Sequence, residues 1–126
     1  MHERWMKEAF VEARFALAKG EVPVGAVLVL NGKLIGRGHN VSIESSDPTA
    51  HAEIRALRDA CRKKKNYRIP GSVLYVTLEP CLMCAGAILH SRLAEVVFGA
   101  REPITGAGGT FMNVLEAGWL NHHCKV

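Results

Sequence analysis

The sequence predicts a single α/β domain: a three-layer α/β/α sandwich with a central mixed sheet of four to five strands flanked by helices. The chain has 126 residues, which is the usual size of one domain. Its composition, 48% apolar and 22% charged, is that of a globular protein and excludes intrinsic disorder. Helix-like and strand-like segments alternate along it, which is typical of a sheet with helices on both faces.

The first part of the chain predicts one helix followed by a hairpin. Residues 2–19 carry apolar side chains at helical spacing, with charged residues between them. The ranges 25–30 and 33–38 are strand-like and flank Asn31 and Gly32. An Asn-Gly pair in this place predicts a tight hairpin, because both central residues of the turn need a positive φ.

A second helix is expected from Asp47 to about Arg62, with Asp47 as its N-terminal cap and Pro48 in the first helical position. The range 72–78 is expected to form a buried strand. The strands that are joined through helices should be parallel, and only the hairpin pair should be antiparallel.

A third helix is expected to open at Pro80 and to run to about Ser91, followed by a short strand at 95–99. Beyond residue 100 the pattern weakens to a Gly-rich loop at 106–109 and a helical turn at 114–117.

Composition and charge narrow the classes of function. Sixteen Lys and Arg against twelve Asp and Glu give a net charge of +4, which tolerates a nucleic-acid partner without requiring one. The longest strongly apolar run, residues 24–30, is far shorter than the roughly 20 residues that a membrane-spanning helix needs. The N-terminus lacks the apolar region of a secretory signal. We therefore expect a cytoplasmic protein without membrane contact.

Seven of the sixteen cations lie between Arg55 and Arg68, and they include the run Arg62 to Lys65. This run, with Lys63, Lys64 and Lys65 at its centre, has two interpretations: a solvated helix end and loop, or a patch that faces phosphates. Cys61 and Cys124 have no cysteine partner at a metal-binding spacing, so both are expected to be packing residues.

Two short motifs, residues 49–53 and 79–84, carry the candidate chemistry. Cys81 and Cys84 are three residues apart in the expected first turn of a helix, so both thiols should point the same way. His51 lies in the expected first turn of the preceding helix. One imidazole and two thiolates are the ligands of a tetrahedral zinc site whose fourth position is open, as in catalytic sites.

Glu53 supplies a general acid and base beside that site. Residues two apart on a helix point about 200° apart, so His51 and Glu53 cannot both bind a metal beside the helix axis. With the zinc beyond the helix end, His51 can bind it while Glu53 takes a proton from the bound water and later gives it to a leaving amine. Helix N-termini should also lower the pKa of both thiols. The alternative is a closed site that takes its fourth ligand from His39, His90 or His122.

These motifs resemble the zinc-dependent nucleobase deaminases of the cytidine and deoxycytidylate deaminase superfamily, which carry His-x-Glu followed by Pro-Cys-x-x-Cys. Within that superfamily the chain looks like the bacterial tRNA-specific adenosine deaminases. The resemblance covers about residues 5–122. The stretches that carry it are 21–27, 47–54, 74–81, 85–92, 97–101 and 105–106.

The resemblance implies a cytidine deaminase-like fold and the hydrolytic conversion of the wobble adenosine of a tRNA anticodon stem-loop to inosine. It implies a homodimer with one Zn²⁺ per subunit, held by His51, Cys81 and Cys84. Zinc-bound hydroxide would attack C6 of adenine, while Glu53 carries the protons to the ring and to the leaving amine.

The same resemblance suggests which residues touch the substrate. Asn40 matches a family asparagine that hydrogen-bonds the target nucleoside. The alternative interpretation of Asn40 is a turn residue without a role in binding. Pro23, Ala52 and Pro80 would line the base pocket.

The chain departs from the family pattern in two places. It ends at Val126, so the single deaminase domain 1–126 is expected to lack the further strand and C-terminal helix usual in the family, with weaker RNA affinity. Glu102 and Pro103 stand where family members commonly have aspartate and a non-proline residue, which bears on the fine specificity of this loop.

Two other functions fit much of the same pattern. A deaminase of a free nucleobase or nucleoside, of guanine or cytosine type, would carry almost the same zinc motif. A non-catalytic zinc module that binds RNA would carry the ligands without needing Glu53. The basic range 55–68 and the flanking stretches favour an RNA substrate.

Overall fold

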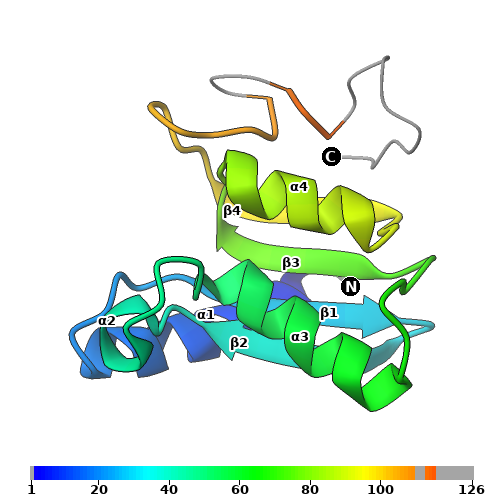
Figure 1. The fold of residues 1–126 in the computed structure, drawn as a ribbon, viewed down its shortest axis with the longest axis horizontal. Coiled ribbons are helices and arrows are strands. Elements are labelled where there is room, and N and C mark those ends of the chain that lie inside the picture. The colour runs from blue at the N-terminus through cyan, green and yellow to red at the C-terminus, as the bar shows by residue number, and fades with distance from the viewer. Residues whose placement is uncertain (1, 110–112, 116–126) are drawn as a thin grey trace.

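A four-stranded sheet runs through the middle of the molecule in the computed structural model, which describes residues 2–109 and 113–115 (Figure 1). The order of the strands across the sheet is β2-β1-β3-β4. The helices and strands in chain order are α1 (His2–Ala18), β1 (Gly25–Leu30), β2 (Lys33–His39), α2 (Ser42–Ser45), α3 (Ala52–Lys64), β3 (Val73–Leu78), α4 (Leu82–His90) and β4 (Glu95–Ala100).

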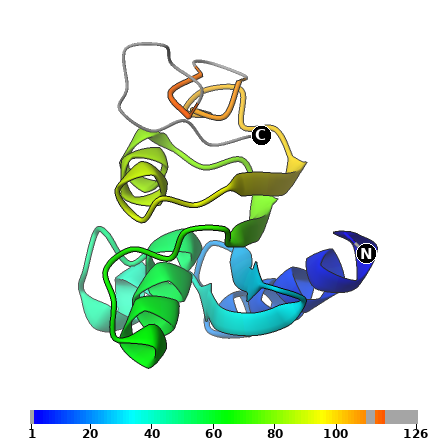
Figure 2. The same ribbon diagram turned by 90° about the vertical axis from the view of Figure 1, so that its right-hand side faces the viewer.

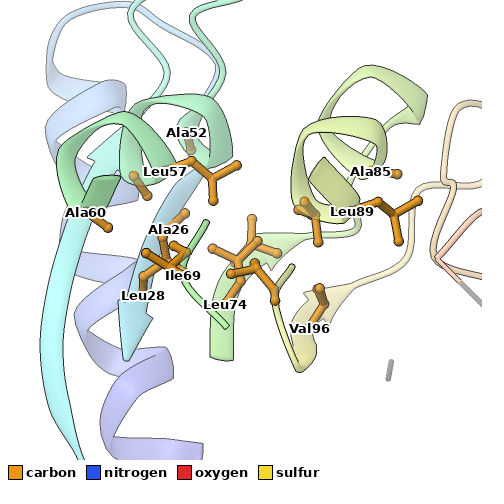
Figure 3. Close-up of a cluster of buried hydrophobic side chains, with 14 of the residues drawn as sticks. Ala26, Leu28, Ala52, Leu57, Ala60, Ile69, Leu74, Ala85, Leu89 and Val96 are labelled. Atoms are coloured by element: carbon orange, nitrogen blue, oxygen red, sulfur yellow. The ribbon is translucent and has the colours of Figure 1, made fainter. Parts of the chain in front are cut away.

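Helices cover both faces of this sheet, so the predicted three-layer α/β/α arrangement is confirmed (Figure 2). On one face, Trp5 of α1 packs against Val27, Val29 and Tyr75. On the other face, α3 and α4 cover the alternate residues of the same strands, because successive side chains of a strand point to opposite faces. Figure 3 shows this larger core, which includes Ala26, Leu28, Leu57, Leu74, Ala85, Leu89 and Val96.

One pair of strands differs from the predicted directions. β1 is antiparallel to β3 as well as to β2, and only β3 and β4 pair in parallel. The chain leaves β2 through α3 and adds β3 on the far side of β1, so β2 and β3 are parallel but not neighbours. The prediction that only the hairpin is antiparallel is therefore wrong. The central place of β1 explains its almost continuous apolar run, since both of its faces are covered.

The start of the second long helix also differs from the prediction. The Asp47 carboxylate accepts hydrogen bonds from the backbone N–H and the hydroxyl of Thr49, at 2.9 and 2.7 Å. It thus forms a local turn, which aspartate favours as strongly as a helix cap. α3 begins only at Ala52, with His51 in the N-cap position. The short helix α2, which has no counterpart among the predicted elements, precedes this turn.

The hairpin turn is as predicted, with φ of 52° at Asn31 and 75° at Gly32. Cys61 is half-buried and packs against the main core, as expected of a packing residue. Of the turn predicted at 114–117, only residues 114 and 115 are described, and His122 and Cys124 lie outside the described residues. None of the helices in the described part of the chain has the length and apolar character that spanning a bilayer requires.

Candidate active site

Two helices bring the predicted metal ligands together. His51 is the N-cap residue of α3, Cys81 is the N-cap residue of α4, and Cys84 follows one turn into α4. Both N-cap residues have extended backbones, with ψ of 159° and 176°, and neither uses its side chain as a cap. The imidazole and the Cys81 thiol are therefore free to point beyond the helix ends.

The three side chains form a triangle that fits a zinc ion. Their ligand atoms all lie within 4.8 Å of one another. The His51 Nδ1 atom is 3.7 Å from the Cys81 Sγ atom and 3.5 Å from the Cys84 Sγ atom. Tetrahedral zinc with Zn–S of about 2.3 Å and Zn–N of about 2.0 Å requires N···S separations of about 3.5 Å. The donor set and its spacing thus agree with a tetrahedral zinc site that uses Nδ1.

The alternative histidines do not complete this site within the described residues. His39 shares a hydrogen bond between its Nδ1 atom and Glu12, at 2.9 Å. His90 is the last residue of α4, at the opposite end of the helix from Cys81. His51, Cys81 and Cys84 are the only group of potential ligands that comes together in 2–109 and 113–115.

The two thiols shift each other's pKa in opposite directions. A hydrogen bond from the Cys84 thiol lowers the pKa of Cys81 to about 5. The same bond, together with burial, raises the pKa of Cys84 above its ordinary value. Helix N-termini were expected to lower both pKa values. The pKa of Cys81 is lowered, chiefly by the Cys84 thiol and to a smaller extent by the Cys84 backbone N–H at the start of the helix, whereas the pKa of Cys84 is raised. Cys84 lies deeper than Cys81, and a bound divalent cation would take the place of its proton.

Glu53 is buried beside this triangle, with 4% of its surface exposed. Burial raises the pKa of its carboxyl group to about 7, and the Cys84 thiol lies within hydrogen-bonding reach. His51 and Glu53 reach the same site because His51 is the N-cap residue, so its side chain does not follow the helical spacing of α3.

A pocket of about 230 Å³ opens next to the triangle. His51, Glu53, Cys81 and Asn40 line it, which brings four of the predicted site residues together. The remaining lining residues are Val22, Val24, Leu78, Glu79, Glu102 and Thr105. The first three supply apolar walls and the last three supply polar groups.

Asn40 has a defined orientation in this pocket. Its Oδ1 atom accepts the backbone N–H of Ala52 at 2.7 Å, which leaves the two amide hydrogens as the free donors of the side chain. Pro23, Ala52 and Pro80 do not line the pocket, although a lining residue stands on both sides of each in the sequence. Ala52 and Pro80 are buried, whereas Pro23 is exposed. Their contact with a base stays a prediction.

Glu79 is the polar residue of the pocket that sequence reasoning missed. It is 2% exposed, and its carboxylate accepts the backbone N–H groups of Glu102 at 3.1 Å and Gly108 at 2.9 Å. A Cβ at Gly106 would lie 2.6 Å from the Glu79 carboxyl carbon, so only glycine fits there. Glu79 thus holds the 102–108 segment against the pocket. The sequence did hold one indication of this role: an acidic residue placed between a buried strand and Pro80 is expected to need hydrogen-bond partners inside the protein.

Comparison with known proteins identifies the family. The family described as "Cytidine and deoxycytidylate deaminase zinc-binding region" matches residues 1–100. A tRNA-specific adenosine deaminase of Bacillus subtilis is 50% identical over 124 residues, which cover 98% of this chain and 77% of that protein. The chain belongs to the tRNA-specific adenosine deaminases. The matched region includes all three metal ligands, so the metal of this deaminase is zinc.

Solved structures agree with this assignment. A structure from studies of A-to-I editing by tRNA:A34 deaminases at the wobble position superposes on this deaminase with a TM-score of 0.94 and 44% identity, over 98% of this chain and 90% of that chain. A guanine deaminase from Bacillus subtilis gives a TM-score of 0.77 and 40% identity, over 80% of this chain and 65% of that chain. The cytidine deaminase-like fold and the resemblance stated from the sequence are both confirmed.

Proposed function

We propose that this deaminase hydrolyses the wobble adenosine of a tRNA anticodon stem-loop to inosine, releasing ammonia. The position of Glu53 is the main support for this activity. Its buried carboxyl group lies beside the His/Cys/Cys triangle, in a pocket that Asn40 also lines. A structural zinc site needs no such acid group, so this geometry favours catalysis over a zinc module that only binds RNA. The similarity to tRNA-specific adenosine deaminases over 98% of the chain supports the substrate class.

His51, Cys81 and Cys84 would hold the zinc, which when bound would supply an activated water, because such a metal lowers the pKa of water to about 7. Glu53 takes the proton of that water and delivers it to a ring nitrogen of the adenine. The water oxygen would add to C6 in the same step. Glu53 would then take the remaining proton of that oxygen and give it to the 6-amino group, so that the C6–N bond breaks, ammonia leaves and the oxygen becomes the C6 carbonyl of inosine. The burial of Glu53 keeps bulk water from competing for these transfers.

Asn40 positions the nucleoside in this scheme. Its oxygen is held by the Ala52 N–H, so its amide hydrogens can be donated to an acceptor of the substrate. Because Ala52 stands between His51 and Glu53, the same bond aligns the donor with the catalytic residues. The apolar walls from Val22, Val24 and Leu78 suit the faces of a base.

We also infer a homodimer that forms through the outer groove between α3 and α4. α4 has no charged residue among its nine, and Leu82 and Met83 in its first turn are exposed. An apolar groove of about 410 Å³ lies beside it, lined by Ile54, Leu57, Arg58, Cys61, Tyr67, Ala87, His90 and Ser91. Ala87→Glu should give a monomer in sedimentation if this groove is the subunit contact, and an unchanged dimer would exclude it.

A tRNA substrate further implies a cytoplasmic location.

The test of this function is a comparison of substrates. The zinc-loaded protein is incubated with an anticodon stem-loop that carries adenosine at the wobble position, and in parallel with free adenosine, guanine and cytidine. We expect inosine in the stem-loop, detected by mass spectrometry of the digested RNA. Turnover of guanine or cytidine without turnover of the stem-loop would instead assign a free-base deaminase, the activity of the similar guanine deaminase.

A further inference from the structure

A second hollow of about 470 Å³ lies on the outer side of α3, where it meets the β2 edge of the sheet. Its lining includes the cations Lys19, Arg37, Arg55, Arg58 and Arg62, together with three acidic residues. His39 and Val41 line this hollow, while Asn40 between them lines the base pocket. The chain segment 39–41 and the first turn of α3 thus contribute residues to both the hollow and the base pocket.

The cations of α3 form a row along one face of the helix. Arg55, Arg58 and Arg62 are three and four residues apart, so they lie above one another on the same side. All three are exposed, while Ala56 and Ala60 of the opposite face are buried. The row extends about 10 Å along the helix axis, starting next to the catalytic end of α3.

Other cations of the hollow already have carboxylate partners. Arg37 donates from Nε to Glu12 at 2.6 Å and from Nη2 to Glu8 at 3.0 Å. Arg58 stands 3.8 Å from Asp47, and the Arg58 side chain is exposed while that of Asp47 is half-buried, so this pair is weak.

Arg55 and Arg62 differ, because neither forms an ion pair with a residue of 2–109 or 113–115. The acidic residue between them, Asp59, is occupied by the backbone N–H of Arg37 at 3.1 Å and by Lys63 at 3.1 Å. Two unpaired guanidinium groups and one weakly paired group thus face the same hollow.

We propose that the row Arg55, Arg58 and Arg62 binds the phosphodiester backbone of the RNA whose base enters the pocket. The inference rests on the proposed function and adds the surface that holds the rest of the substrate. Guanidinium groups bind phosphates through two parallel hydrogen bonds, and repeated phosphates match a row of cations better than a single small anion does. Lys63 to Lys65, in contrast, lie at the far end of α3, and the pairing of Lys63 with Asp59 favours a solvated helix end there.

The test uses the full chain and a stem-loop that carries inosine at the wobble position, so that no turnover occurs during binding. The variant is Arg55→Gln/Arg62→Gln. The control is Arg14→Gln/Lys33→Gln, which removes the same charge from exposed residues outside the lining of the hollow. We expect the row variant to weaken binding about tenfold at 0.1 M salt and to reduce the salt slope, d log K/d log[salt], by between about 1 and 2. The control should change the slope by less than half as much.

Deamination of the adenosine stem-loop gives an independent readout. The row variant should raise KM and leave kcat within about twofold, because these arginines do not line the base pocket. Three outcomes would overturn the proposal. They are an unchanged salt slope in the row variant, equal changes of the salt slope in the row variant and the control, and a changed oligomeric state with unchanged RNA binding. If the wild-type protein forms no inosine, the proposed function fails, while the binding experiment still decides whether the row holds RNA.

Discussion

The side-chain oxygen of Asn40 accepts the backbone N–H of Ala52 at 2.7 Å, and this bond joins the end of β2 to the first residue of α3. A helix N-terminus presents N–H groups without partners inside the helix, and here an asparagine from another element fills the role of a cap. Since His51 and Glu53 flank Ala52, the residue proposed to hold the substrate also sets the position of a zinc ligand and of the proposed proton carrier.

The two roles of Asn40 can be separated by two substitutions. Asn40→Asp keeps an oxygen for the Ala52 N–H but loses the amide donor, so it should fold normally and lose at least tenfold in kcat/KM. Asn40→Ala loses both groups and should in addition lower the free energy of unfolding by about 1 kcal/mol. Steady-state kinetics and urea denaturation measure the two effects. Wild-type kcat/KM in Asn40→Asp would contradict the substrate contact.

Glu53→Gln should retain zinc and lose turnover. The amide has nearly the shape of the carboxyl group but cannot carry protons, and general acid–base catalysis contributes about 10²- to 10⁴-fold. We expect kcat to fall by that range, with zinc content by elemental analysis equal to that of the wild type. A variant that keeps more than a tenth of the wild-type kcat would exclude Glu53 as the proton carrier.

Removal of the metal should abolish activity and lower stability. Zinc binds the folded triangle and not the unfolded chain, so a chelator should lower Tm by about 5 °C or more, and added zinc should restore both properties. Cys84→Ala should lose zinc and activity. Cys61→Ala is the matched control, because this thiol lies outside the triangle and should keep both. Full activity of metal-free protein would refute the site.

Glu79→Gln tests the anchor of the 102–108 segment. The amide can offer one oxygen to the two N–H groups of Glu102 and Gly108, and its own NH₂ group would face the other donor. We expect a loss of about 1–3 kcal/mol in the free energy of unfolding and faster amide hydrogen exchange at both positions. KM should rise while zinc is retained.

Glu3→Gln provides the comparison for Glu79→Gln, since Glu3 is an exposed carboxylate on α1. It should leave stability and KM unchanged. Unaltered exchange at Gly108 in Glu79→Gln would contradict the anchoring role.

Much of the zinc site was predictable because its chemistry is local. Cys81 and Cys84 lie within a motif of six consecutive residues, 79–84, and His51 and Glu53 lie within a motif of five, 49–53. The hairpin at Asn31-Gly32 was predictable for the same reason, since the turn depends on the conformations of two neighbouring residues. The start of α3 was not, because Asp47 could cap a helix or form its own turn, and the partner that decides is Asn40, twelve residues before Ala52.

The sequence by itself thus determined the metal ligands, the candidate proton carrier and the Asn31-Gly32 hairpin turn, all of which depend on neighbours within a few positions. The tertiary structure decided that β3 joins β1 rather than β2, that Glu79 holds the 102–108 segment, and that the row from Arg55 to Arg62 faces a hollow beside the base pocket. These features arise from contacts between distant segments. Their free energy depends on how whole elements pack, which no short window of sequence contains.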